Sequence, residues 1–276
     1  MSKYSYTHHL IKQTATFGVF CGFGILLFKY REGFYILQDL SVFQFVSFFS
    51  LVIFGITLSG SKLSRIVNSF NIYLKKSEWF SLSSMTTVLN GIFFKSGSLA
   101  TSAYLKKKYD FPYASFVGSF IGDQLIILFI ASLIGSITTA FLIYSGSVQI
   151  FFIFIVFMII TVFLFILLGG KITLPKKEGR IWEQLRIGSD SFNTLLQNKN
   201  LFYMLCTHNI SLIIAAGLRL FTARSILHQE IPLAHCFLFA AAIPIIRIIP
   251  IAYSDIGVRE IMVGFLSEAI GSGFKA

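Results

Sequence analysis

Hydrophobic residues in this chain gather in long runs, and polar residues fill the shorter segments between them. A helix needs about 20 mostly apolar residues to cross the hydrocarbon core of a bilayer. The runs of roughly suitable length are residues 10–28, 40–58, 113–134, 149–168, 201–223 and 256–270. The pattern predicts an all-α polytopic membrane helix bundle, with about six spans in a single integral membrane domain at residues 1–276.

Two further apolar segments do not have the pattern of plain spans. Residues 79–94 are short and rich in Ser and Thr, and residues 233–253 contain Pro244 and Pro250 with Arg247 between them. Proline interrupts a helix, and non-helical backbone at membrane depth is tolerated only where protein or water covers it. We therefore predict two broken or re-entrant segments, near residues 79–94 and 233–256.

Composition supports lipid as the solvent of this chain. Hydrophobic residues make up 55% of it and charged residues 13%, whereas a soluble domain contains roughly 25% charged residues. The mean hydropathy is +0.77. The three cysteines lie in apolar runs and form no CxxC motif, which argues against a disulfide framework or a thiolate metal site. We expect no cofactor, and we expect the first apolar run to remain as a signal-anchor helix.

The distribution of basic residues predicts the topology. Sixteen lysines and arginines fall in residues 1–13, 59–112 and 170–199, against three in residues 29–39, 135–148 and 224–232. Because basic loops stay in the cytoplasm, we predict a cytoplasmic N-terminus in the cell membrane. Residues 59–112 would form cytoplasmic loops with a re-entrant segment, and residues 170–199 a cytoplasmic or interfacial linker. The same rule explains the net charge of +11, so no nucleic-acid partner is expected.

Ionisable residues at membrane depth are costly and therefore mark candidate functional positions. Asp123 lies within the predicted span 113–134. Its carboxylate either faces an internal cavity or pairs with a cation on another helix. Arg247 lies between two prolines, where its guanidinium either binds a lipid phosphate or extends toward the interface.

Other candidates lie near the two interrupted segments. Asp255, Arg259 and Glu260 open the last apolar run. Asp255 and Glu260 either cap that helix and suit its dipole or take part in a site. Asn90 and Lys95 flank the end of the short segment 79–94. Lys95 either binds an anionic headgroup or is a loop lysine that follows the topology rule.

Three segments resemble the transmembrane flippase-like region of the lysylphosphatidylglycerol synthase family and its stand-alone relatives. They are Asn90 with Gly97 and the stretch 103–108, the span segment 116–128 around Asp123, and the closing sequence Gly257-Val258-Arg259-Glu260. Gln124 stands where that family usually has arginine. The resemblance implies a helical lipid-handling membrane protein. Nothing in the chain resembles the soluble aminoacyl-transferase domain of the larger synthases.

These observations favour transport over catalysis, because no GxSxG, HExxH, Walker or GxGxxG motif is present. The leading hypothesis is a protein that binds and translocates an anionic phospholipid or polyprenyl phosphate in envelope lipid or glycan assembly. Its phosphate ligands would be Arg247 and Arg259, and its partners a second copy or an envelope-assembly enzyme. The alternatives are an accessory subunit of a membrane-embedded glycosyl or acyl transferase, and a secondary transporter of a small solute.

Overall fold

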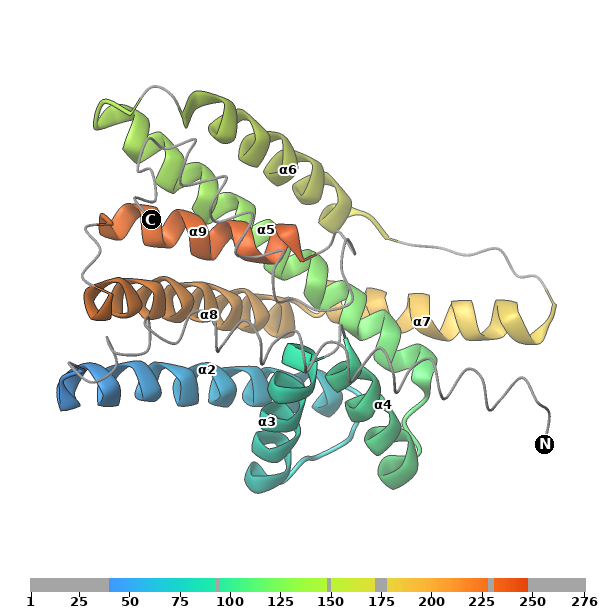
Figure 1. Ribbon diagram of the computed structural model, residues 1–276. Helices are drawn as coiled ribbons and strands as arrows, with labels where there is room; N and C mark the ends of the chain where they lie inside the picture. The colour runs from blue at the N-terminus through green and yellow to red at the C-terminus, as the bar shows by residue number, and fades with distance from the viewer. Residues whose placement is uncertain (1–39, 93–94, 148–149, 172–177, 228–230, 248–276) are drawn as a thin grey trace, which may run out of the picture.

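The computed structural model describes residues 40–92, 95–147, 150–171, 178–227 and 231–247, and every regular element in these ranges is a helix. The predicted all-α fold is confirmed. The α-helices are α2 (Val42–Asn68), α3 (Lys76–Ile92), α4 (Ser96–Tyr109), α5 (Tyr113–Tyr144), α6 (Phe151–Gly169), α7 (Arg180–Gln197), α8 (Lys199–Ile226) and α9 (Leu233–Ile246) (Figure 1).

Four of these helices, α2, α5, α6 and α8, are long and apolar enough to cross a membrane. This number is compatible with the prediction of about six spans, because the runs at 10–28 and 256–270 lie outside the described residues. The shorter helix α9 has 14 residues and contains Pro244 near its end. It covers the first part of the broken segment expected at residues 233–256, and the remainder is not described.

Helices α2 and α8 lie side by side and antiparallel, with α9 on the other side of α8 (Figure 1). Side-chain hydrogen bonds link α2 and α8 at two positions along their length. Gln44 near the start of α2 bonds Ser225 near the end of α8, while Ser61 and Lys62 bond His208 and Asn209. Bonds at separate levels fix the register between the two helices, so residues 61–62 and 208–209 face each other.

Helix α5 runs obliquely across the other helices and contacts α6, α7, α8 and α9 (Figure 1). Small residues let its neighbours approach closely. At Gly118, a Cβ atom would lie 2.0 Å from the backbone oxygen of Gly188 on α7. The second half of α7 thereby packs on α5 and buries Phe192 and Leu195. Its first half keeps Ile181 exposed, which suits the interfacial position predicted for this segment.

The short segment predicted at residues 79–94 is one arm of a helical hairpin. Helix α3 is followed along the chain by α4, and the pair stands on one side of the bundle against α2 (Figure 1). The Ser83 hydroxyl donates to the Ile56 carbonyl at 2.8 Å, and the Trp79 ring packs on Gly60. Part of the predicted loop region at 59–112 is therefore helical, including the last turn of α4 with Lys106, Lys107 and Lys108.

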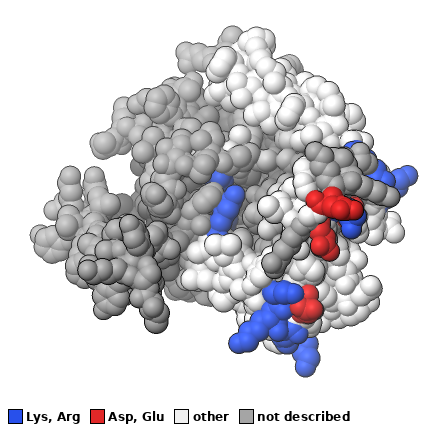
Figure 2. Space-filling model, turned by 90° about the vertical axis from the view of Figure 1, so that its right-hand side faces the viewer, with Lys and Arg blue, Asp and Glu red and all other residues white. Residues whose placement is uncertain are grey.

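The two ends of the bundle differ in charge. We call the end where α2 and α6 finish and α5 and α8 begin the basic end, because the described lysines outside the bundle interior gather there, in and beside α3 and α4, after the end of α6 and at the start of α8. Figure 2 looks onto this end and shows separate groups of Lys and Arg side chains, with acidic side chains beside them. The predicted topology makes the basic end the cytoplasmic one.

Candidate functional site

Three polar side chains meet inside the bundle, one from each of three helices: Lys62 of α2, Asp123 of α5 and Asn209 of α8. We call them the central triad. At about 1.5 Å per residue, Asp123 and Asn209 each lie about 15 Å from the starts of their helices. The antiparallel register of α2 and α8 brings Lys62 to the same level. The triad thus lies inside the bundle, displaced toward the basic end.

The triad forms a closed ring of polar contacts. The Lys62 Nζ lies 2.8 Å from Asp123 Oδ2 and donates to Asn209 Oδ1 at 3.0 Å, while Asn209 Nδ2 donates to Asp123 Oδ1 at 3.5 Å. Asn209 is 0% exposed and Asp123 5%. A buried carboxylate keeps its charge only with a cation beside it. Of the two alternatives for Asp123, the described geometry is that of a carboxylate paired with a cation on another helix.

The ring leaves hydrogen-bonding capacity unused. An ammonium group has three N–H donors, and the two described contacts of Lys62 engage two of them. A carboxylate offers about four acceptor positions, and Asp123 accepts one short contact from Lys62 and one long contact from Asn209. The charges cancel within the ring. The triad can therefore exchange partners with an incoming anion without first breaking a saturated network.

The turn of the α3–α4 hairpin approaches α5 close to the triad. The Asn90 carboxamide accepts from the backbone N–H of Gly97 at 2.9 Å, and Lys95 between them has a left-handed backbone with φ 55°. The Lys95 Nζ lies 6.0 Å from the centroid of the Phe120 ring, and Phe120 precedes Asp123 by about one helical turn. Asn90 thus shapes the turn, and the turn presents a cation to the part of α5 that holds Asp123.

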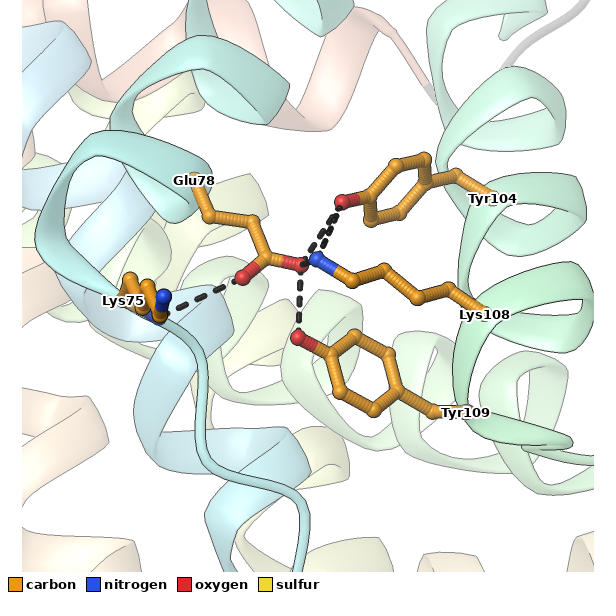
Figure 3. A network of polar contacts seen from close by, with 5 residues as sticks. All are labelled: Lys75, Glu78, Tyr104, Lys108 and Tyr109. Atoms are coloured by element: carbon orange, nitrogen blue, oxygen red, sulfur yellow. Dashed lines mark hydrogen bonds and ion pairs between the residues drawn. The ribbon is translucent and has the colours of Figure 1, made fainter.

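A second polar network ties the base of the same hairpin (Figure 3). The Glu78 Oε1 atom accepts from Tyr104 and Tyr109 at 2.7 Å each and from Lys108 at 2.9 Å. The Glu78 Oε2 atom accepts from the backbone N–H of Lys75 at 3.4 Å. We call this network the hairpin clamp, because it joins the start of α3 to the end of α4.

The electrostatics of the hairpin clamp favour its charged state. Burial raises the pKa of the Glu78 carboxyl, but hydrogen bonds from Tyr109, Lys108 and Tyr104 outweigh it and lower this pKa to about 2. The hydrogen bonds to Tyr104 and Glu78 raise the pKa of Lys108. Burial, followed by the bond to Glu78, raises the pKa of Tyr109. At neutral pH Glu78 is therefore a carboxylate, Lys108 an ammonium and Tyr109 a neutral phenol.

The structure describes four of the seven predicted site residues. It brings Asp123 into the triad, and it places Asn90 and Lys95 at the hairpin turn near α5. Arg247 follows the end of α9, is exposed, and its charge acts on Arg219 of α8. Asp255, Arg259 and Glu260 lie outside the described residues, as does the closing sequence that includes Gly257.

Two members of the triad were missed in the sequence. Lys62 belongs to a group of basic residues that the topology rule already explains, so it gave no separate signal. Asn209 carries no charge, but an amide within the apolar run 201–223 is unusual enough to have marked this position. Within the described ranges, no group of three or more His, Cys, Asp or Glu side chains has the arrangement of a metal site.

Comparison with protein-family models, with curated proteins and with solved structures finds no match to this chain.

Proposed function

We propose that this integral membrane protein binds the anionic headgroup of a membrane lipid at the central triad and translocates that lipid between the two leaflets. The observation that supports the proposal is the ammonium of Lys62, whose side chain is 12% exposed and which has two partners among the described residues and a donor to spare. Lysine binds phosphate as a point charge. A lipid phosphate is therefore a natural competitor of Asp123 for this cation.

The arrangement of Asn209 makes such an exchange feasible. Its amide group contacts both charged members of the triad, accepting from Lys62 and donating to Asp123. When a phosphate oxygen takes the place of the Asp123 carboxylate at Lys62, the carboxylate keeps its Asn209 donor. An unpaired buried carboxylate would be costly, and this donor reduces that cost. The triad would thus alternate between an ion pair within the protein and an ion pair with the lipid.

The α3–α4 hairpin suits the entry of a headgroup from the basic end. Half-length helices whose turn lies within a membrane protein often line binding sites. The Lys95 cation at this turn and the Phe120 contact lie on the approach to Asp123 along α5. The suggested resemblance to the flippase-like family agrees with this role and remains part of the proposal.

Lipid exchange in vesicles tests the proposal directly. The full chain would be reconstituted in phosphatidylcholine vesicles containing fluorescent phosphatidylglycerol, and dithionite bleaching would report the fraction that changes leaflet. We expect faster exchange of phosphatidylglycerol than in protein-free vesicles, and loss of this activity in the double variant Lys62→Met/Asp123→Leu. Replacing both charges by apolar groups avoids leaving one charge buried alone.

A matched control separates the triad from the general positive charge of the protein. Lys106→Gln removes a half-exposed lysine of α4, which pairs with the exposed Asp110, and should leave exchange at the wild-type rate. The double variant must elute as a folded species before its rate is interpreted. Wild-type exchange in the folded double variant would show that the triad is not the site, and no exchange by the wild-type protein would refute translocation itself.

A further inference from the structure

A second group of unsatisfied polar atoms lies at the end of the bundle opposite the basic end. Both ring nitrogens of His235, in the first turn of α9, are buried and have no hydrogen-bond partner among the residues that the structure describes. Neutral imidazole has one donor and one acceptor, and each buried polar atom left without a partner costs about 1–3 kcal/mol. His235 is therefore placed where a polar ligand would be favourable.

Arg224 adds a cation at the same end. It lies in the last turn of α8, its guanidinium carbon is 4.2 Å from the centroid of the Phe221 ring, and its Nε atom is buried without a hydrogen-bond partner in the described part of the chain. Only residues 227–232 separate the end of α8 from the start of α9, so Arg224 and His235 lie at the same end of this helix pair. Helices α8 and α9 pack directly on each other. The end of α8 thus places a guanidinium beside the start of α9.

The start of α9 strengthens the preference for an anion. Pro232 is the N-cap residue of the helix, and its side chain makes no capping hydrogen bond to the first turn. The exposed N–H groups of a helix N-terminus carry a partial positive charge and attract anions. The acidic residues that the structure describes are Glu78, Asp110, Asp123, Glu178, Glu183 and Asp190, and all of them belong to the triad or to the basic end.

From these features we infer that Arg224 and His235 form a second site, which binds a phosphate-type oxyanion at the start of α9. A phosphate group has acceptors for the Arg224 Nε–H and for an imidazole N–H of His235. The inference does not require translocation, because this pair lies on α8 and α9 at the opposite end from the triad. On the predicted topology, it faces the outer leaflet.

The source of the phosphate is either a lipid headgroup or the free ion, and equilibrium dialysis distinguishes the two. Radiolabelled inorganic phosphate and radiolabelled dihexanoylphosphatidylglycerol would each be titrated against the purified, delipidated full chain. The same titrations in the Lys62→Met/Asp123→Leu chain report this site without the triad's cation. We expect one equivalent of at least one probe to bind in that chain. Phosphate binding would indicate the free ion as a ligand, and binding of the lipid alone would indicate a headgroup.

Two variants test the residues. Arg224→Gln and His235→Phe should each weaken binding about tenfold or more, as expected when a charge-assisted hydrogen bond worth about 1.5–3 kcal/mol is lost. Arg186→Gln, which alters an exposed arginine of α7, should leave binding unchanged.

The His235→Phe variant also distinguishes a ligand site from a structural role. Without ligand, it should unfold at a temperature equal to or above that of the parent chain, because it removes two unsatisfied polar atoms and keeps an aromatic ring. Binding of neither probe, or unchanged affinity in both variants, would overturn the inference. Loss of binding in the triad double variant would also overturn it, by assigning the anion to the triad.

Discussion

The carboxylate–lysine pairs of the hairpin clamp and of the central triad differ in how fully their atoms are satisfied. In the hairpin clamp, one oxygen of Glu78 accepts three short hydrogen bonds, and its lysine partner is 49% exposed. In the central triad, Asp123 receives one short and one long contact, and the side chain of Lys62 is 12% exposed. The more deeply enclosed pair thus has fewer partners.

This difference supports a structural role for the hairpin clamp and, for the triad, the proposed exchange of ion-pair partners with a ligand. Glu78 has more donors than a single ion pair needs, and losing one of them leaves the others in place. The triad has no such reserve. Burial makes its charges depend on each other, while its unused donors and acceptors leave positions for a ligand. The comparison predicts that disrupting the triad has the larger effect on stability and on any transport activity.

The largest expected effect comes from breaking the triad on one side. Asp123→Leu leaves the Lys62 ammonium buried with only Asn209, and removal of one partner of a buried ion pair costs about 3–5 kcal/mol. The double variant Lys62→Met/Asp123→Leu should recover most of this loss, because neither charge then remains alone. Unfolding of the detergent-solubilised protein with sodium dodecyl sulfate measures all three stabilities, together with Lys62→Met, as a double-mutant cycle.

The matched substitution in the hairpin clamp is Glu78→Gln, which should cost clearly less than Asp123→Leu because glutamine still accepts from the two tyrosines. Equal losses in the two variants would mean that the triad is as accessible to water as the clamp. The two networks would then not differ in their contribution to the free energy of unfolding.

A smaller effect is expected from spreading the hairpin turn. A Cβ atom at Gly97 would lie 2.4 Å from the Thr86 backbone oxygen and 2.6 Å from its Cα, so Gly97→Ala must push α3 and α4 apart. Overpacking of this kind costs about 1–3 kcal/mol. The control is Gly91→Ala in the same hairpin, where the added carbon would meet no atom within 4 Å.

The two glycine variants would be compared by the same unfolding assay and by lipid exchange. We expect Gly97→Ala to lose stability and to slow exchange, since the turn with Lys95 moves relative to α5. Gly91→Ala should match the wild-type protein or gain up to about 1 kcal/mol from better helix propensity. If the two variants behaved alike, the hairpin turn would have no part in the proposed lipid exchange.

Hydropathy located the long apolar helices but ended α5 too early. Helix α5 continues past residue 134, where the predicted span ends, to Tyr144, through a segment that contains Gly, Ser and Thr. Thr139 lies in this segment, is 0% exposed, and donates its hydroxyl to the Gly135 carbonyl of its own helix at 2.7 Å. Hydropathy identifies segments that contact lipid. A polar residue whose hydroxyl bonds a carbonyl of its own helix can continue that helix inside the protein, where hydropathy does not detect it.

The candidate site was predictable only in part, for a related reason. A carboxylate in an apolar run is conspicuous, so Asp123 could be identified as costly and in need of a partner. Its partners could not, because they come from α2 and α8, far away along the chain, and their meeting depends on the register of those helices. Asn90 and Lys95 were chosen beside a predicted helix break, but the paired helix α4 and the clamp at its base require tertiary packing.

The smallest expected effect is a pH-dependent loosening of the hairpin clamp, which would sharpen its contrast with the triad. The pKa of Glu78 in the folded protein is about 2, below the ordinary value of about 4.3. The stabilisation from its charge is therefore fully present above the ordinary pKa and is lost as the pH falls through about 2. Hydrogen exchange in α3 and α4, normalised to α8 in the same sample, should rise between about pH 4 and pH 2. The opening free energy should fall by about 1 kcal/mol, the value typical of a partly exposed ion pair.

Glu78→Gln should remove this pH dependence, since no carboxyl remains to be protonated there. A wild-type hairpin whose relative exchange is constant over this range would show that Glu78 does not hold its base closed.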